Sequence, residues 1–338
     1  AFEGCILWGV DFAPNSQLET IGDDAFSYCT NLSDVKFGNQ IKEIGNSACR
    51  NCKSLQNLSI PDSVIRIGES AFYGCNEKLF NKDYSPGFIS VDGWIVDYDW
   101  DVVFEEMDRE KAFIKCRGIA DGFDLMRQYH KYNDIKLAEG IKGVGSEAFY
   151  CCIVGYGLRN INIPDSIEYI GMDAFDGCAP ELFDTNSIPG VKMVDGWIVG
   201  QTLKDKDLSF TRLNLSKSKG IAASSFMGCD NLMSVVFPKD ISRIEEFTFK
   251  WCDSLGSDTG TIDIPKSVKY IGDEAFAYCE SFTSITIPDG VEYIGDNAFS
   301  GCDGITNVVI PSSVTEIKDN IFNERSLKDI SYIKVIFI

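Results

Sequence analysis

The feature that most constrains this chain is a sequence unit that recurs about every 23 residues. Two adjacent copies end in Ala275-Phe276…Cys279 and Ala298-Phe299…Cys302. Between them, a short alternating apolar run ends at a proline and is followed by apolar residues three or four positions apart. A fixed period of this length, with this change in apolar spacing, is typical of a solenoid in which each repeat forms one coil.

The apolar positions of the repeat predict how one coil folds. Ile285 and Ile287 alternate, so both point inward from a short strand, and Pro288 ends that strand because it has no N–H to donate. We expect the Ala-Phe pair to lie on a single helical turn. One coil buries roughly seven apolar side chains at ~1.5–3 kcal/mol each, against about 1.5 kcal/mol for ordering each residue. A lone coil is therefore unstable, and stability must come from stacking on neighbouring coils.

The Ala-Phe…Cys element recurs along the chain with two interruptions. It is regular from Ala1 to Cys75, is lost until Ala148, and is lost again between Cys178 and Phe226. Because the first unit begins part-way, we expect the sequence to be a segment of a longer chain. Counting strand positions gives about fourteen coils. The repeat thus predicts one solenoid over residues 1–338, with a continuous parallel sheet and no second domain.

The two interruptions are related to each other. Residues 60–96 match residues 163–199 at an offset of 103, with twenty identities in 37 positions. Both segments contain Val-Asp-Gly-Trp-Ile-Val, in which Asp-Gly predicts a tight turn between two extended arms. The sequence therefore predicts degenerate hairpin coils at 76–135 and 179–221. We expect Trp94 and Trp197, at equal places in these hairpins, to belong to the core.

The charge balance excludes some partners. Lys and Arg number 31 against 51 Asp and Glu, a net charge of −20. Nucleic acids and anionic lipids require a basic surface, so we expect neither as a partner. No apolar run approaches the ~20 residues needed to cross a bilayer, so we expect no membrane insertion within this sequence.

Three segments carry a family resemblance: IPDSVIRIGESAFYGC (60–75), IPDSIEYIGMDAFDGC (163–178) and IPDGVEYIGDNAFSGC (287–302). They resemble the repeats of BspA-type leucine-rich repeat proteins, and the resemblance covers nearly the whole chain. It implies an α/β solenoid, a right-handed leucine-rich-repeat superhelix with a concave parallel β-sheet of about fourteen coils and short helical turns. It also implies a secreted or cell-surface protein, since several members of that family act as adhesins for host or matrix proteins.

Thirteen cysteines suggest redox or metal chemistry, but their positions favour a structural role. Ten of them occupy one repeat position, which predicts a ladder of small buried thiols, and disulfides between neighbouring coils are the alternative. Cys49-x-x-Cys52 has no second pair, and Cys49 only replaces the Phe of the repeat. We therefore expect no metal and no cofactor. The ten are Cys5, Cys29, Cys52, Cys75, Cys152, Cys178, Cys229, Cys252, Cys279 and Cys302.

Catalytic and calcium motifs are weak. His130 is the only histidine and has no repeat-linked serine or acid, which disfavours a Ser-His or Cys-His mechanism. A run of acids resembles an EF-hand loop, but Val102 stands where that loop requires glycine, and its alternation favours a solvated strand face. We predict no catalytic residue, although paired carboxylates of the hydrolase type stay open. The acids are Asp97, Asp99, Asp101, Glu105 and Asp108.

The residue between the two inward positions of each strand points outward, which predicts a row on the concave face. This row is small, polar and nearly free of the Trp, Tyr and Arg residues that dominate interface hot spots. The alternatives are Trp100 and Trp251, with the inserted loops 153–157 and 256–260 at one edge of the solenoid. The candidate binding residues of the row are Lys36, Ser59, Lys136, Asn162, Asn214, Asp263 and Thr286.

These observations favour a non-catalytic extracellular or cell-surface binding protein. It would be adhesin-like and would recognise a host or matrix protein or a glycan through the concave sheet or the loop edge. A structural spacer in a larger surface protein is the first alternative. A hydrolase module that uses acidic residues is the second.

Overall fold

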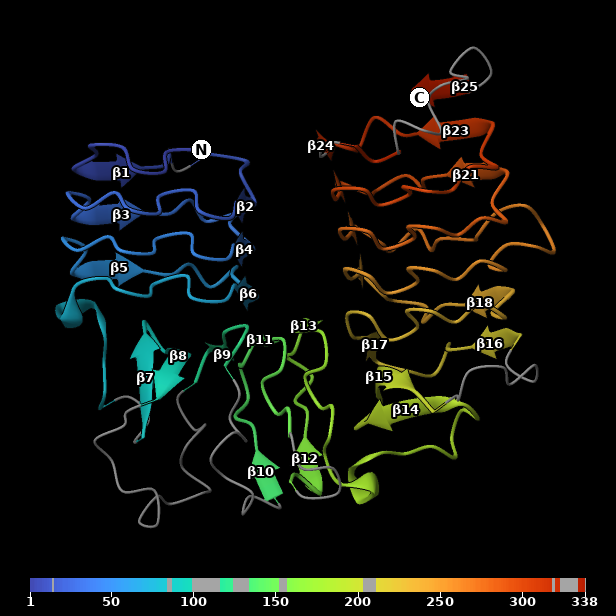
Figure 1. Ribbon diagram of the computed structural model, residues 1–338, viewed down its shortest axis with the longest axis horizontal. Coiled ribbons are helices and arrows are strands. Elements are labelled where there is room, and N and C mark those ends of the chain that lie inside the picture. The colour runs from blue at the N-terminus through green and yellow to red at the C-terminus, as the bar shows by residue number, and fades with distance from the viewer. Residues whose placement is uncertain are drawn as a thin grey trace. The chain divides into compact units, whose positions relative to one another are not determined.

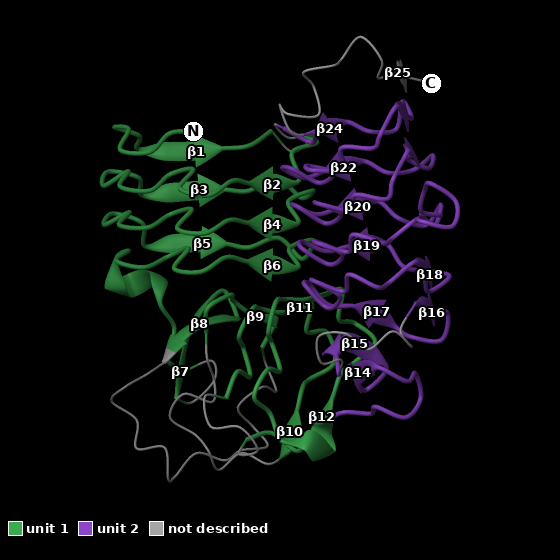
Figure 2. Cartoon of the chain, turned by 45° about the vertical axis from the view of Figure 1, so that its right-hand side comes forward, with its two compact units in different colours: residues 1–182 green, residues 183–338 purple. Residues whose placement is uncertain are grey.

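The computed structural model describes residues 1–13, 15–83, 87–98, 116–123, 134–151, 157–202, 211–317, 320–322 and 334–337. The chain divides into two compact units, residues 1–182 and 183–338 (Figure 2). Each unit is described by itself below, and the single solenoid over residues 1–338 stays a prediction.

Unit 1 begins with regular coils, each of which contributes one strand to each of two parallel ladders (Figure 1). The strand order is β1-β3-β5 in the first ladder and β2-β4-β6 in the second. Equivalent residues of successive repeats pair in register, as Val35 does with Leu58 and Ile44 with Ile67. The strands are β1 (Gly9–Asp11), β2 (Thr20–Ile21), β3 (Asp34–Lys36), β4 (Glu43–Ile44), β5 (Asn57–Ser59) and β6 (Arg66–Ile67).

The rest of unit 1 contains the first hairpin and more degenerate coils. One sheet has the order β13-β11-β9-β8-β7, and β10 pairs with β12 in another. The strands are β7 (Phe88–Val91), β8 (Trp94–Tyr98), β9 (Gly118–Ile119), β10 (Asp134–Lys136), β11 (Gly143–Val144), β12 (Asn160–Asn162) and β13 (Tyr169–Ile170). Two 3₁₀ helices, η1 (Glu77–Leu79) and η3 (Pro180–Leu182), follow the cysteine corners.

Unit 2 repeats this plan. Its hairpin joins a ladder in the order β14-β15-β17, and its regular coils form the ladders β19-β20-β22-β24, β16-β18 and β21-β23-β25. The strands are β14 (Val191–Val194), β15 (Trp197–Gln201), β16 (Arg212–Asn214), β17 (Gly220–Ile221), β18 (Ser234–Val236), β19 (Arg243–Ile244), β20 (Tyr270–Ile271), β21 (Ser284–Thr286), β22 (Tyr293–Ile294), β23 (Asn307–Ile310), β24 (Glu316–Ile317) and β25 (Lys334–Phe337).

The Ala-Phe corner is not the helical turn expected from the sequence. Positive φ angles at Asp24 (50°) and Tyr28 (59°) flank Ala25-Phe26 and prevent the helix from continuing. The amide of Phe26 donates to Ala48 O of the next coil at 2.7 Å, whereas that of Cys29 donates to Phe26 O of its own coil at 3.1 Å. Alternate backbone amides of the corner therefore donate to the next coil. The described residues contain no α-helix.

The coil count is also lower than expected. The described residues form about eleven turns, against the fourteen counted from the sequence. The two Asp-Gly hairpins use chain length without completing a coil, because only β8 and β15 of each pair join a neighbouring parallel strand. The hairpins themselves are confirmed: Asp92 (φ 46°) and Gly93 (φ 83°) both have the positive φ of a type I′ turn.

Stacked aromatic rings and buried aliphatic side chains fill each unit. In unit 2, the ring centroid of Phe249 lies 5.4 Å from that of Phe226 and 5.5 Å from that of Phe276, and Phe276 lies 5.3 Å from Phe299. All four rings are almost fully buried. Because the Phe of each coil contacts the Phe of the next, the core is continuous along the stack.

Both hairpin tryptophans lie in the core, as predicted, and each requires a glycine in the coil that follows. Trp94 is fully buried and pairs in register with Gly118, as Trp197 does with Gly220. A Cβ added at Gly118 would lie 2.2 Å from the Trp94 ring. Any larger residue at this position must displace a buried indole.

We therefore predict that Gly118→Ala lowers the free energy of unfolding by about 1–3 kcal/mol, the range for overpacking a core. Urea denaturation of the full chain measures it. Trp94→Leu removes the obstructing ring, so the cost of Gly118→Ala in that background is expected to be smaller.

Gly22→Ala is the matched control, because Gly22 has no positive φ and no atom within 4 Å of the added Cβ. It is expected to leave the urea midpoint unchanged or slightly higher. Equal midpoints for Gly118→Ala and the parent would contradict the prediction.

Candidate functional site

The outward face of the β1-β3-β5 ladder carries the first two candidate binding residues. Lys36 and Ser59 are register partners on neighbouring strands, and both are exposed, with Val35 pointing inward between the outward positions of β3. Each three-residue strand therefore has two outward positions. Asp34 and Asn57 form a second outward row, which was not among the residues predicted from the sequence.

These two rows line a hollow of about 1010 Å³ in unit 1. Its other wall is the segment 78–83, which contains the end of η1 and the residues after it. The lining combines charges of both signs with amides, the hydroxyl of Ser59 and two aromatic rings. The lining residues include Lys36, Asn57, Ser59, Phe80, Asn81 and Asp92.

Hydrogen bonds fix the rim of the hollow at the hairpin turn. Asp92 Oδ2 accepts from the amide of Ile60 and from Arg117 Nη1, both at 2.8 Å. Arg117 Nη2 also donates to Asp62 at 2.9 Å. This carboxylate thus anchors the residue after β5 to the hairpin turn, whereas Lys36 and Asn57 are exposed.

The other residues of the predicted row lie in different settings. Lys136 is exposed on β10 beside Asn162 on β12, whose amide bonds to both N and O of Leu137 (3.0 and 3.2 Å). In unit 2, Asn214 accepts from the amide of Ser216 at 3.1 Å, and Thr286 is exposed on β21. Asp263 is exposed but lies outside any strand. The structure therefore places only Lys36 and Ser59 on the hollow.

Of the two aromatic alternatives, the structure describes only Trp251. Trp251 is 45% exposed at an Ala-Phe-type corner of unit 2. Trp100 and loop residues 153–156 lie outside the described residues, as do His130 and the EF-hand-like acids after Asp97. The loop 256–260 is described and folds back through a hydrogen bond from the amide of Gly256 to Met233 O at 2.8 Å.

The cysteines form the thiol ladder that the repeat predicts. All twelve described cysteines are free, and those of the predicted ladder are buried apart from the exposed Cys5 and the half-buried Cys75. Cys152 lies outside the described residues. Cys302 Sγ donates to Phe276 O at 3.1 Å, and Cys52 Sγ donates to Phe26 O at the same distance. Most of the described ladder thiols thus donate to the Phe carbonyl of an earlier coil, whereas Cys75 Sγ donates to Cys49 O at 3.0 Å.

Burial raises the pKa of several of these thiols. It raises the pKa of Cys229 and of Cys302 to about 12, and that of Cys116 to about 12 as well. The hydrogen bond with Cys52, together with complete burial, holds the pKa of Cys49 well above its usual range. Hydrogen bonds with the thiols of Cys49 and Cys75 lower the pKa of Cys52 to about 4. Both Cys49 and Cys52 are fully buried, so access rather than pKa limits the reactivity of this pair.

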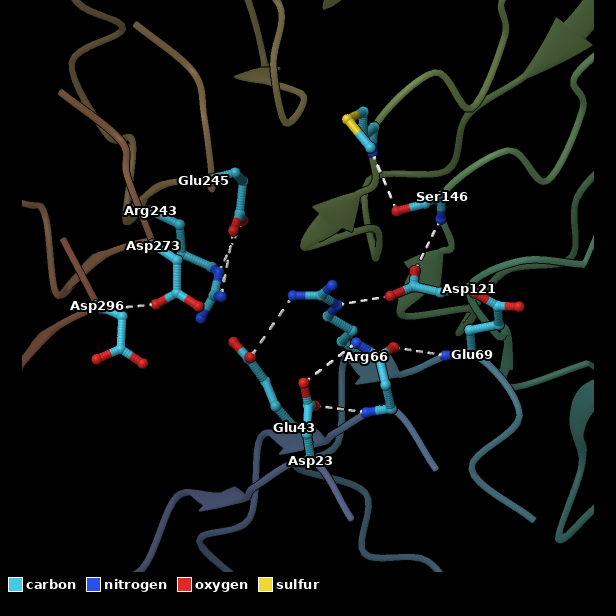
Figure 3. Close-up of polar contacts among 12 residues, drawn as sticks. Asp23, Glu43, Arg66, Glu69, Asp121, Ser146, Arg243, Glu245, Asp273 and Asp296 are labelled. Atoms are coloured by element: carbon cyan, nitrogen blue, oxygen red, sulfur yellow. Dashed lines mark hydrogen bonds and ion pairs between the residues drawn. The ribbon is translucent and has the colours of Figure 1, made fainter. Parts of the chain in front are cut away.

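A buried ion centre that the sequence did not reveal lies on the second ladder of unit 1 (Figure 3). Arg66 on β6 donates from Nε to Asp121 Oδ2 at 2.7 Å, and its Nη1 lies 4.0 Å from Glu43. Its guanidinium also lies 5.2 Å from the ring centroid of Tyr169. In unit 2, Arg243 pairs with Glu245 at 2.8 Å and lies 3.6 Å from the centroid of Tyr270.

Side chains beside this centre bond from one coil to the next (Figure 3). Asp121 Oδ1 accepts from the amide of Ser146 at 2.7 Å, and Asp23 Oδ1 accepts from the amide of Asn46 at 2.7 Å. Asp273 does the same for Asp296 at 2.8 Å in unit 2. The residue after Ile-Gly, or after Ile119-Ala120 for Asp121, thus accepts a hydrogen bond from a backbone amide of the following coil, which is a structural role.

Metal and membrane features are limited to what the described residues contain. In that part of the chain, no three His, Cys, Asp or Glu residues converge as a possible metal site. Among the same residues, no helix has the length and apolar character to span a membrane.

The repeat matches a known family. The sequence family described as "BspA type Leucine rich repeat region" matches residues 1–79, 125–189 and 219–337, in six copies. The chain belongs to this family. BspA-type repeat proteins are generally non-enzymatic. No curated relative matches the chain.

Several solved bacterial structures are similar to this BspA-type chain. A leucine-rich repeat protein from Bacteroides ovatus is 23% identical, with 98% of this chain and 92% of that chain covered and a TM-score of 0.35. A leucine rich cell surface protein from Faecalibacterium prausnitzii is 19% identical, with 97% and 90% covered and a TM-score of 0.23. The pneumococcal vaccine antigen PcpA is 16% identical, with 98% and 67% covered and a TM-score of 0.27.

We predict that Arg66→Ala destabilises the fold by about 3 kcal/mol or more, because it leaves the buried Asp121 carboxylate without its cation. Lys36→Ala is the matched control: its pair with Asp11 is 3.5 Å long and both side chains are mostly exposed, so less than about 1 kcal/mol is expected. Urea denaturation measures both, and equal effects would contradict the assignment of Arg66 as a buried anchor.

We also predict selective alkylation of the cysteines. At pH 8 a thiol with a pKa of about 12 is ionised in roughly one molecule in ten thousand, so Cys302 is expected to react with iodoacetamide at least about a hundredfold more slowly than the exposed Cys5. Mass-spectrometric mapping of the labelled native protein measures the two rates. Comparable rates would show that the ladder thiols are accessible.

Proposed function

We propose that this BspA-type chain is a non-catalytic, extracellular or cell-surface binding protein of the adhesin kind. It recognises a host or matrix protein, or a glycan, on the outward face of the β1-β3-β5 ladder. The observation that carries the proposal is the hollow of about 1010 Å³ between that face and residues 78–83. A concave polar surface on rigid strands holds binding groups in place at little entropic cost.

The chemistry of the hollow supports a polar ligand. Lys36 and the carboxylate of Asp34 lie on one strand, and Asn57 and Ser59 on the next, so cation, anion, amide and hydroxyl groups are presented together. Phe80 adds a half-buried ring to the opposite wall. This mixture fits the hydroxyls of a glycan or the mixed surface of a protein. In such sites a small number of polar groups beside apolar side chains fixes the orientation of the ligand.

A structural spacer is the second candidate, and the coil-to-coil hydrogen bonds favour it. Backbone hydrogen bonds join neighbouring coils at the corners as well as at the strands. For example, the amide of Phe276 donates to Ala298 O at 2.8 Å. Such a stack resists bending and can hold another domain at a distance. A hydrolase has the least support, because proteins of this family are generally non-enzymatic.

The experiment is an array of matrix proteins and glycans, probed with the full chain at physiological salt. We expect at least one hit, and we expect the double variant Lys36→Ala/Asn57→Ala to weaken it about tenfold or more, because few residues carry most of an interface's binding energy. Both side chains are exposed, so the substitutions are not expected to alter folding.

Lys136→Ala/Thr286→Ala is the matched control, since it changes exposed strand positions that do not line the hollow. A silent array would favour the spacer. A hit that both double variants weaken equally would place the binding site elsewhere.

A further inference from the structure

One corner position of unit 2 carries aromatic residues where the backbone favours glycine. The residue before the repeat cysteine has a left-handed backbone, and it is glycine at Gly228 and Gly301, both with φ of 73°. Trp251 (φ 61°) and Tyr278 (φ 62°) hold the same conformation in the two coils between them. Glycine adopts these angles freely, whereas a bulky residue does so only at a cost in backbone energy. Two consecutive coils therefore keep large rings at an unfavourable position.

The two rings form an exposed pair. Trp251 is 45% exposed and Tyr278 is 38% exposed, and their centroids lie 6.3 Å apart. Met227, one coil earlier, is 40% exposed. Exposed Trp and Tyr side chains fixed on a rigid scaffold are the usual anchors of a protein interface. Neither ring contributes to the buried core of its unit.

The Trp251 coil already places a cation on its aromatic rings. Lys250 Nζ lies 4.6 Å from the ring centroid of Trp251 and 5.1 Å from that of Phe247, and it forms an ion pair with Glu274. Phe247 has a φ of 58°, so a second bulky residue of this coil has left-handed backbone. These contacts show that the corner offers aromatic faces at a distance suited to cation–π interaction.

Carboxylates flank the aromatic pair. The residue after the cysteine is exposed and acidic in four successive coils, at Asp230, Asp253, Glu280 and Asp303. Burial, and then repulsion by Asp230 and Glu280, raises the pKa of Asp253, so these first three carboxylates lie close enough to interact. The equivalent residues of unit 1 are Thr30, Lys53 and Asn76, so this acidic row is not a general feature of the repeat.

We propose that Trp251 and Tyr278, with the carboxylates of Asp253 and Glu280 beside them, form a docking surface for a basic peptide segment of another protein. Its Lys or Arg side chains stack on the two rings and pair with the carboxylates. The net charge of −20 repels nucleic acid, sulfated glycans and a second copy of this chain, whereas it attracts a basic partner. The surface belongs to unit 2 and does not rest on the proposed function of the hollow in unit 1.

The experiment measures binding of a fluorescent peptide of alternating Arg and Ser to the full chain, by anisotropy at physiological salt. A peptide of alternating Glu and Ser is expected not to bind. Trp251→Gly/Tyr278→Gly is expected to weaken Kd about tenfold or more, the loss of two cation–π contacts. Because glycine is native at this position in other coils, we expect the variant to fold and to melt no earlier than the parent.

Asp253→Asn/Glu280→Gln tests the carboxylates without changing the aromatic rings, and a similar weakening is expected. Asp240→Asn/Asp289→Asn is its matched control, because it removes the same charge from exposed positions of unit 2 outside the corner. This control is expected to change Kd less than about twofold at physiological salt.

Two outcomes would overturn the proposal. Equal weakening by the two acid-to-amide variants would mean that the peptide responds only to net charge. Unchanged Kd in Trp251→Gly/Tyr278→Gly would remove the aromatic pair from the surface. The Lys36→Ala/Asn57→Ala variant is expected to bind the Arg-Ser peptide like the parent, so failure of the hollow and failure of this surface can be told apart.

Discussion

Hydrogen bonding between neighbouring coils is the interaction on which the rest of this structure depends. A coil of about 23 residues cannot pair its own strands, so its backbone groups find partners in the coils before and after it. This happens at the three-residue strands, at the two-residue strands and at the Ala-Phe corner, where alternate amides cross to the next coil. The Cys thiols add a further bond at the same corner, as Cys302 does to Phe276 O. An inward position therefore accepts only a residue that packs against the equivalent residues of the coils before and after it.

This restriction separates the residues that hold the fold from those that are free to differ. Outward strand positions are exposed and differ in type from coil to coil, as Lys36, Ser59 and Lys136 do. Both candidate surfaces also lie where the repeat is broken. The hollow forms where η1 follows Cys75, and the aromatic corner forms in the coil that has Glu245 and Trp251 in place of the usual glycines. In a protein with such uniform coils, departures from the repeat are the places to look for function.

The inward residues could be predicted from sequence because their signals are local. The alternation of Ile285 and Ile287, the Asp-Gly turns and the recurrence of cysteine all fall within one period, and the strand, the hairpins and the thiol ladder follow from them. The second ladder was missed because two residues such as Tyr293–Ile294 are too short to show alternation. The corners differ from the predicted helical turn because the left-handed residue before Ala-Phe has no constant type, being Asp24 in one coil and Ser47 in the next.

The candidate sites were less predictable, because they depend on which coils become neighbours. Lys36 and Ser59 are one period apart, so their proximity follows from the repeat. Arg66 and Asp121 are 55 residues apart and meet only because Asp121 follows β9, whose coil stacks on that of β6. The wall of the hollow similarly depends on where the chain turns after Cys75. Period and composition alone do not determine such contacts.

The pairing of a buried tryptophan with a glycine in the following coil has a consequence for how such chains evolve. A regular coil offers the same donors and acceptors to both neighbours, so recombination can add or remove one and leave every ladder complete. A hairpin coil lacks that independence, since Trp94 needs Gly118 and Trp197 needs Gly220. The inherited module is thus the hairpin together with its successor. Crossover points that separate the two would join an indole to a coil with no space for it.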